Sequence, residues 1–448
     1  MGHWMDAAAL GFARLLTRVF YRSVEIRGAE HVPAEGPVIF VANHGNSLVD
    51  PLLLVALLPR RVRFLAKSTL WKNPLLMPFL RLFEAIPVYR QQDGVDTGRN
   101  QDTFARCHEQ LAAGATIALF PEGISHDEPQ LQPLKTGAAR IALGAEAAGG
   151  PSTVRIVPVG LTFEEKGRFR SRALLVMGPA IDTQPERDSA GLDAREAARS
   201  LTARIDAGLR EVTLNFPSWE FSTLVERAAD VFAEEQRTLP GRPELGERFS
   251  LRKTIGDRYA NVREKFPERT QQIESMAHHY DGMLRALALR DDQVTAQYPW
   301  QHASAYLGDR LAVLLLGLPV AIVGTLLNYL PYRIPGWVAL AVSRNGDLPA
   351  TYKILTGVVL MPTTWALEAW AATSLWGLPA GILTGLAAPA TGFFALVYME
   401  RNASMWREIL AYLTLRWRPE RAAALRALRA DIRHEIAALV ADAANNGR

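Results

Sequence analysis

An uncharged run of twenty residues, Leu311–Leu330, constrains this chain more than any other feature. A helix of that length crosses the hydrocarbon core of a bilayer, which is about 30 Å thick. A second uncharged run, Ala369–Met399, follows Gly357–Leu367 across the single charge of Glu368. Because Gly377-Leu378-Pro379 interrupts it, the second region holds either one long span or a tight helical hairpin. The sequence therefore predicts an integral membrane protein.

The composition indicates that the membrane region is only one part of the chain. The mean hydropathy of +0.01 is high for a soluble enzyme and low for a transporter. Lys and Arg total 50 against 46 Asp and Glu, a formal net charge of +4, and no nucleic-acid motif accompanies it. The single cysteine, Cys107, excludes a disulfide framework and a cysteine-based metal site, and we interpret it as a surface or half-buried thiol. We expect no metal and no nucleic acid as partners.

Short apolar runs alternate with helical stretches from Val32 to Phe163, a pattern typical of a layered α/β domain. The predicted helices are Pro51–Leu58, Thr97–Ala113, Lys135–Ala148 and Leu192–Val212. The predicted strands are Val38–Val41, Val62–Leu65, Ala85–Tyr89, Thr116–Phe120, Val154–Val159 and, as a further candidate, Leu174–Met177.

The predicted layout has five parts. Residues 1–29 form an amphipathic helix that lies on a membrane surface or packs on the next domain. An α/β domain (30–215), a helical insert (216–305) and a transmembrane region (306–400) follow. Residues 401–448 form a basic amphipathic helix, whose arginines either mark the cytoplasmic side or form a solvated face.

His44 is the first residue with a chemical role. It follows the strand Val38–Val41, and Pro51, which is tolerated at the first helical position, opens the next helix. His44 thus lies at the carboxyl end of a strand, where α/β sheets place reactive groups. Asp50 is six positions further on, and a turn through residues 45–47 can bring the two together. A carboxylate on one imidazole nitrogen fixes the tautomer and leaves the other nitrogen as a base for an alcohol.

Three further strand ends carry polar or turn residues. Ile86–Arg90 ends in a guanidinium, which suits bidentate phosphate binding. Phe120-Pro121-Glu122-Gly123 ends another strand, and its glycine lets backbone amides approach an anion closely. Val157–Gly160 is predicted to end a later strand in a proline turn. The four strand ends are expected to converge on one edge of a sheet.

This ordered set resembles the glycerophospholipid acyltransferase superfamily, the PlsC-like enzymes. Their four blocks are a His-x4-Asp motif, a strand ending in arginine, Phe-Pro-Glu-Gly and a Val-Pro strand, and the match covers residues 30–180. The insert and late spans are similar to those of the fungal-type glycerol-3-phosphate and dihydroxyacetone-phosphate acyltransferases. Two departures occur. The first block is His-x5-Asp, a length that the fungal-type branch also has, and the third continues Ile-Ser-His instead of Thr-Arg-Ser.

The resemblance assigns roles to the residues of these blocks. It implies that His44 deprotonates an acceptor hydroxyl, which attacks a thioester carbonyl, and that Asp50 holds the imidazole without a covalent enzyme intermediate. It implies no cofactor, with acyl-CoA or acyl carrier protein as the acyl donor. Glu122 orders its turn or contacts a substrate hydroxyl. The groups expected to hold the acceptor phosphate are Arg90, Gly123, Lys135 and, in place of the missing arginine, Ser125 and His126.

The expected function is acyl transfer to glycerol-3-phosphate or 1-acylglycerol-3-phosphate at a membrane, with the catalytic domain on the cytoplasmic side. The alternatives are an acyltransferase for another lysolipid acceptor and a non-catalytic lipid-binding protein. A cytosolic active site and a cytosolic tail together require an even number of membrane crossings, yet the apolar runs divide into two or three segments. One run is therefore a candidate for a re-entrant or interfacial hairpin.

Overall fold

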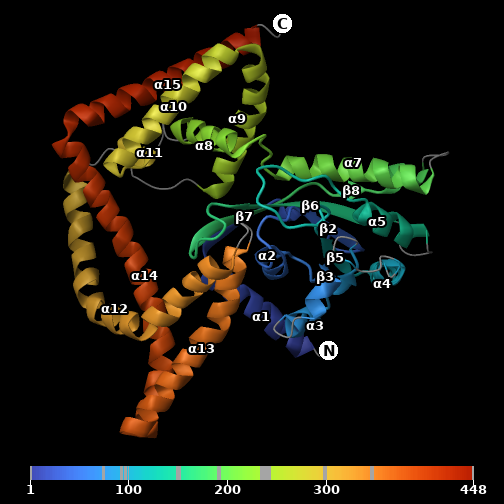
Figure 1. The fold of residues 1–448 in the computed structure, drawn as a ribbon, viewed down its shortest axis with the longest axis horizontal. Coiled ribbons are helices and arrows are strands. Elements are labelled where there is room, and N and C mark those ends of the chain that lie inside the picture. Colours follow the sequence, from blue (N-terminus) through green and yellow to red (C-terminus); the bar gives the residue numbers. More distant parts are fainter. Residues whose placement is uncertain are drawn as a thin grey trace. The chain divides into compact units, whose positions relative to one another are not determined.

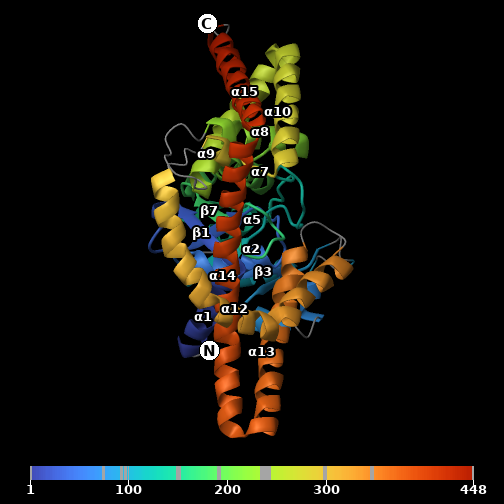
Figure 2. The same cartoon turned by 90° about the vertical axis from the view of Figure 1, so that its left-hand side faces the viewer.

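The computed structural model describes residues 3–72, 76–90, 94, 98, 100–147, 153–188, 193–232, 244–295, 300–343 and 348–445. The chain folds into two compact units. Met1–Ser218 with Val342–Ile354 form the first, and Trp219–Ala341 with Leu355–Arg448 form the second. The first unit is a layered α/β structure and the described part of the second is helical, which confirms the predicted fold class (Figure 1, Figure 2).

A mixed eight-stranded sheet forms the centre of the first unit. Its order is β1-β7-β6-β2-β5-β3-β4, and β8 pairs with β6. Neighbours from β6 through β2, β5 and β3 to β4 run parallel, whereas β7 and β8 pair antiparallel with β6. The strands are β1 (Tyr21–Arg27), β2 (Val38–Ala42), β3 (Val62–Lys67), β4 (Ile86–Val88), β5 (Thr116–Leu119), β6 (Arg155–Phe163), β7 (Ser171–Met177) and β8 (Ile181–Asp182).

Helices cover both faces of this sheet (Figure 1). α4, α5 and α7 pack on one face against the buried side chains of Ile39, Ile117 and Ile156, and α1 packs with α2 on the other. Because successive strand residues point to opposite faces, a fully buried strand such as β2 supplies both layers. The helices of this unit are α1 (His3–Phe20), α2 (Val49–Leu57), α3 (Met77–Leu82), α4 (Asn100–Ala112), α5 (Gly137–Ala147), α6 (Gln184–Asp188) and α7 (Ala194–Val212).

The N-terminal helix is shorter than the 1–29 expected from the sequence. It ends at Phe20, because the chain continues as β1, an edge strand that pairs parallel with β7. The helix packs against α2, and Arg14 Nε donates to the carbonyl of Ala56 at 3.2 Å. Of the two alternatives, packing on the following domain is therefore the one observed.

The predicted proline turn at Val157–Gly160 is wrong, because β6 runs on through it to Phe163. Pro158 lies where the antiparallel partner of β6 changes from β8 to β7, so its missing N–H interrupts no ladder. Its carbonyl accepts from Gly178 N at 2.9 Å. Gly160 permits close packing with the end of α7, since a Cβ there would lie 1.7 Å from the carbonyl oxygen of Val212.

Cys107 is fully buried in α4, deeper than the surface or half-buried position expected. Burial raises the pKa of its thiol to about 12. The thiol therefore stays protonated at neutral pH and is a poor nucleophile there.

The second unit departs from the sequence prediction at its C-terminal end. The helix expected to begin at residue 401 is the continuation of α14, and α15 begins only at Pro419. The apolar stripe of α15, with Leu425, Ile432 and Leu439 buried, packs inside the helical unit and leaves most of the arginines on a solvated face. The helices are α8 (Trp219–Phe232), α9 (Leu245–Lys265), α10 (Pro267–Leu287), α11 (Asp291–Thr295), α12 (Trp300–Val342), α13 (Pro349–Trp376), α14 (Leu378–Trp417) and α15 (Pro419–Asn445).

Three helical segments are long and apolar enough to cross a membrane: Leu314–Val342, Pro349–Trp376 and Leu378–Trp417. The second and third form a helical hairpin that turns at Gly377, whose φ of 87° suits glycine. The hairpin, not one long span, is thus the observed alternative. Buried Asn328 of α12 donates to the carbonyl of Ala388 at 3.1 Å and accepts from Trp365 Nε1 at 2.8 Å, which ties the three helices together.

Candidate active site

His44 and Asp50 form a hydrogen-bonded pair at the carboxyl edge of the sheet. β2 ends two residues before His44, and Asp50 lies in the first turn of α2. Nδ1 of His44 is 2.9 Å from Oδ2 of Asp50, whose side chain is fully buried, while 19% of the His44 side chain is exposed. The buried carboxylate places the ring proton on Nδ1 and leaves Nε2 as the basic nitrogen. Nε2 has no hydrogen-bond partner among the described residues.

The turn between β2 and α2 is fixed through its backbone amides, each by a different partner. Because a buried amide without a partner is costly, these bonds define one conformation of the turn. The amide of His44 donates to Glu122 Oε1 at 2.8 Å, that of Asn46 to Asp50 Oδ2 at 2.7 Å, that of Ser47 to Ser125 Oγ at 3.1 Å, and that of Leu48 to Thr351 Oγ1 at 3.2 Å.

Ser47 has the one left-handed conformation in this turn, with φ 43°. That region is uncommon for residues other than glycine, and here it lies inside the longer His-x5-Asp spacing. Ser125 supports it, since its Oγ accepts from the Ser47 amide and lies 3.2 Å from the Ser47 hydroxyl. The structure thus places Ser125, a candidate phosphate ligand, against the turn between β2 and α2.

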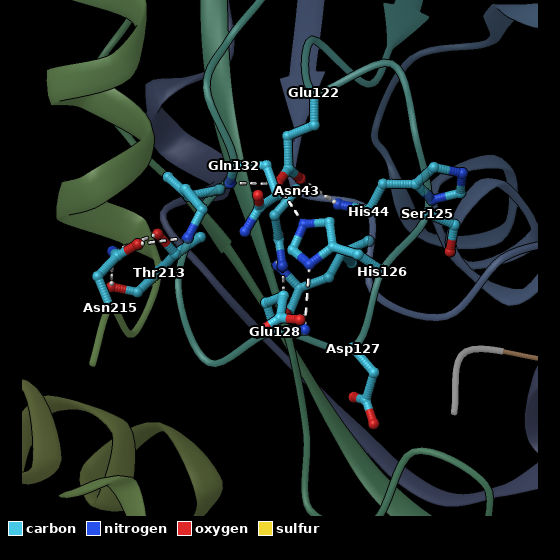
Figure 3. A network of polar contacts seen from close by, with 12 residues as sticks. Asn43, His44, Glu122, Ser125, His126, Asp127, Glu128, Gln132, Thr213 and Asn215 are labelled. Carbon is cyan, nitrogen blue, oxygen red and sulfur yellow. Dashed lines mark hydrogen bonds and ion pairs between the residues drawn. The ribbon is translucent and has the colours of Figure 1, made fainter. Parts of the chain in front are cut away.

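The Phe-Pro-Glu-Gly block supports His44 at both its ring and its backbone. The Phe120 ring stacks on the imidazole with centroids 4.0 Å apart and an interplanar angle of 11°. Glu122 is buried and accepts the amides of His44 and Gln132, both at 2.8 Å (Figure 3). Of the two alternatives for Glu122, ordering the turn matches these contacts.

His126 completes the same network. Its Nδ1 accepts from the amide of Glu128 at 3.1 Å, so Nε2 carries the proton and donates to Glu122 (Figure 3). Its own amide donates to the carbonyl of His44 at 3.1 Å. Both residues considered as replacements for the missing arginine, Ser125 and His126, are therefore hydrogen-bonded within the protein.

Two cationic side chains meet at Gly123. Arg90, two residues after β4, donates from Nη1 to the carbonyl of Gly123 at 2.6 Å. Gly123 has φ 73°, and a Cβ there would lie 2.9 Å from Cε of Lys135. Because Gly123 follows Glu122 directly, both cationic side chains lie at the loop whose glutamate contacts the His44 amide. A purely structural role for Arg90 would be a salt bridge with Asp93 or Asp96, and both of these residues lie outside the described ranges.

Two family models match consecutive parts of the chain. The acyltransferase family model covers residues 23–162, which include the site just described. Residues 23–162 thus match an acyltransferase domain of the PlsC type. A second model, the glycerol-3-phosphate acyltransferase 2 C-terminal domain, covers residues 241–445, and the resemblance inferred from the sequence is therefore confirmed.

Three curated relatives match between 44% and 79% of this chain. An uncharacterised acyltransferase of Schizosaccharomyces pombe is 25% identical over 79% of this chain and 66% of its own length. Glycerol-3-phosphate O-acyltransferase 2 of Saccharomyces cerevisiae is 31% identical over 44% of this chain and 26% of its own length. Glycerol-3-phosphate O-acyltransferase 1 of the same yeast is 27% identical over 61% of this chain and 47% of its own length. The chain thus spans less than two thirds of each relative.

The acyltransferase domain includes a segment, residues 342–354, that no sequence motif marks. Thr351, at the start of α13, is buried and accepts the amide of Leu48, the N-cap residue of α2. Lys353 Nζ donates to the carbonyl of Gly167 at 2.5 Å. The sequence offered only a threonine and a lysine between two apolar runs, and no local pattern connects them with a turn three hundred residues earlier.

The loop between β6 and β7 is a second contribution that the motifs do not mark. Asn46 Nδ2 donates to the carbonyl of Lys166 at 3.2 Å, and Lys166 Nζ pairs with Asp127 at 2.6 Å. A Cβ on Gly45 would lie 3.2 Å from that ammonium, so a cation sits beside the residue after His44. Buried Tyr21 lies next to Asn46, and burial together with the Asp50 carboxylate raises its pKa, so the phenol stays neutral.

We expect Thr351→Val to lower the kcat of acyl transfer while leaving the KM for the acyl donor and the KM for the acceptor unchanged. Valine has nearly the same shape but cannot accept the Leu48 amide, so the N-terminal turn of α2 that carries Asp50 loses a support. The unfolding free energy should fall by about 1 kcal/mol. Thr351→Ser keeps the hydroxyl that accepts the Leu48 amide and should restore kcat and the unfolding free energy. Thr363→Val, on an exposed part of the same helix, is the matched control. Equal activities for Thr351→Val and Thr363→Val would contradict a positioning role.

Proposed function

We propose that this chain is a membrane-bound O-acyltransferase that moves a fatty acyl group from acyl-CoA or acyl carrier protein to a hydroxyl of glycerol-3-phosphate or 1-acylglycerol-3-phosphate. The observation that carries the proposal is the His44–Asp50 pair, whose Nε2 has no hydrogen-bond partner in the described part of the chain, together with the cations of Arg90 and Lys135 at Gly123. A base and an anion-binding surface on one sheet edge suit an acceptor that carries both a hydroxyl and a phosphate.

The proposed reaction has two proton transfers, both at His44. Nε2 takes the proton of the acceptor hydroxyl as its oxygen attacks the thioester carbonyl, and Asp50 stabilises the imidazolium that forms. The tetrahedral intermediate collapses with cleavage of the carbon–sulfur bond, and Nε2 returns the proton to the leaving thiolate. The products are an ester and a free thiol. Arg90, Lys135 and the backbone around Gly123 hold the acceptor phosphate and orient its hydroxyl.

The decisive assay offers the membrane fraction a labelled acyl group, carried either by CoA or by acyl carrier protein, together with a panel of acceptors. We expect acylated product with glycerol-3-phosphate or its 1-acyl form. Product only with a different lysolipid would support the alternative acceptor. Ser125 and His126 are already hydrogen-bonded within the protein, so the usual phosphate ligands at this position are not provided, which is consistent with such an acceptor. Absence of product with every acceptor and both donors would contradict an enzyme and favour a lipid-binding protein.

Arg90→Lys tests the phosphate site. If the guanidinium binds phosphate through two parallel bonds, a lysine ammonium cannot replace it. We expect a KM for the phosphorylated acceptor raised about tenfold, with the KM for acyl-CoA and the kcat little changed. Arg106→Lys, an exposed arginine of the same domain, is the matched control. An unchanged acceptor KM together with a lowered melting temperature would remove Arg90 from the phosphate site.

The three apolar helices support a membrane-embedded protein. We propose that its site faces the cytosol, where anionic acceptors and acyl donors are found. The end of α12 and the start of α13 belong to the unit that contains His44. The α13–α14 hairpin leaves that side and returns to it, which accounts for two crossings. α12 contains Pro319, Pro331 and Pro335 and bends sharply (Figure 1). We therefore propose that it enters the bilayer without crossing it.

Single cysteines test this topology in sealed vesicles. Native Cys107 is buried and protonated, so it stays silent toward a membrane-impermeant maleimide. We expect Glu109→Cys in the acyltransferase domain and Glu420→Cys at the start of α15 to react from the same side. Trp376→Cys at the hairpin tip should react only from the opposite side. Labelling of Glu420→Cys from the side opposite to Glu109→Cys would establish an odd number of crossings and refute the arrangement.

A further inference from the structure

The helical unit contains an apolar cavity that no step of the proposed reaction uses. Its volume is about 400 Å³, and α8, α9, α10 and α15 line it. Its walls include Val225, Ile255, Val262, Ile273, Ala277 and Ile432.

The cavity lies where two separate hydrophobic clusters of this unit meet. Tyr280 and Ile432 belong to one cluster, and Val262 and Ile273 to the other, yet all four line the cavity. Ile436 packs against both. Protein interiors are normally packed as densely as organic crystals, so a void of this size forfeits many dispersion contacts. An apolar occupant would restore them.

The walls offer an occupant almost no polar partner. The hydroxyl of Tyr259 already donates to Glu274 at 2.9 Å, and that of Tyr280 donates to Asp291 at 2.6 Å. Apolar cavities exclude water and bind apolar molecules, and one of about 150 Å³ holds the six carbons of benzene. In proportion, this cavity holds a chain on the order of 16 carbons.

Two of the lining residues are charged, and both are arginines. Arg227 is neutralised by Asp281 at 2.6 Å. Arg258 is exposed and has no ion pair among the described residues, so its charge remains available at the edge of the cavity. A cation beside an apolar cavity complements an aliphatic chain that ends in an anion. We propose that this cavity binds a long-chain fatty acid, with the chain inside and the carboxylate at Arg258.

The test uses the full chain in lipid nanodiscs and palmitate as the probe. We expect palmitate to raise the melting temperature in a concentration-dependent way, because a ligand that binds only the folded state stabilises it. Octanoate, which fills half the length, should bind at least about tenfold more weakly, since each buried methylene contributes to affinity. His44→Ala should bind palmitate like the wild type, which separates this site from the active site.

Two substitutions with matched controls locate the site. Ala277→Phe fills the cavity from α10 and should weaken palmitate binding at least about tenfold, whereas His278→Phe, exposed on the same helix, should not. Arg258→Glu should weaken binding about threefold to tenfold, and Lys265→Glu, exposed on the same helix and outside the lining, should have no effect. If Ala277→Phe does not fold, the comparison of Arg258→Glu with Lys265→Glu, both at exposed positions, still tests whether palmitate binds at this cavity.

Three results would overturn the proposal. The first is a wild-type protein whose melting temperature does not respond to palmitate. The second is equal palmitate uptake by all variants and by empty nanodiscs, which would indicate partition into lipid. The third is an Ala277→Phe variant that melts higher than the wild type and still binds palmitate normally, because the ligand would then lie elsewhere.

Discussion

His44→Ala is expected to lower the turnover of acyl transfer by about 10²–10⁴-fold, which is the usual contribution of a positioned general base. Nε2 of His44 is the basic nitrogen of a pair whose other member is fully buried, and no hydrogen bond within the described residues occupies it. The loss should appear in kcat, because the base acts on the reacting hydroxyl and not on the phosphate or the acyl chain.

Asp50→Asn belongs to the same experiment. The His44 ring and the Asn46 amide both donate to Oδ2 of Asp50, whereas an asparagine carries no negative charge and can turn its NH₂ group toward the His44 ring as a donor. The imidazole would then adopt the wrong tautomer, and we expect a loss within the same range. His278→Ala, an exposed histidine of the helical unit, is the control. Retention of more than about a tenth of the wild-type rate by His44→Ala would remove it from the role of base.

The sequence predicted the inner part of the acyltransferase domain well. Strands β2 to β6 and most of β7 lie where the apolar runs place them, because buried parallel strands have continuous apolar sequences. Parallel neighbours end on one sheet edge, and the expected convergence of His44, Arg90 and Glu122 is found there. The pairing of His44 with Asp50 needed only a turn, and the intervening Gly45 and Asn46 allow one.

The parts that sequence reasoning missed depend on distant partners. β1 has alternating charged residues and no apolar run, and only its pairing with β7 makes it a strand. Pro158 indicated a turn locally, but the change of partner strand tolerates it inside β6. Thr351 accepts the Leu48 amide of the turn between β2 and α2 from a helix three hundred residues away, and no period or motif encodes that contact.

Glu122 is the residue for which local sequence and distant contacts combine. Pro-Glu-Gly alone is an ordinary loop, and its glutamate would be expected in solvent. In the structure the carboxylate is buried and accepts three donors, the amides of His44 and Gln132 and Nε2 of His126. It joins the turn after β2 to the loop after β5, so the position of the His44 backbone depends on a side chain from a different strand.

Glu122→Gln should therefore damage catalysis although it changes only one atom of the side chain. The NH₂ group of the glutamine would replace one of the two carboxylate oxygens. Either the amide of His44, or the amide of Gln132 together with Nε2 of His126, would then lose its hydrogen-bond acceptor. An unpaired buried donor costs about 1–3 kcal/mol of unfolding free energy, and a displacement of His44 near 1 Å lowers turnover on the order of 10²-fold. Glu128→Gln, an exposed glutamate of the same loop, should leave both quantities unchanged. Glu122 orders the turn that carries His44 and does not itself hold the acceptor phosphate in the proposed reaction, so the loss of activity should appear in kcat. A raised KM for the acceptor with a normal kcat would instead show that Glu122 contacts the substrate.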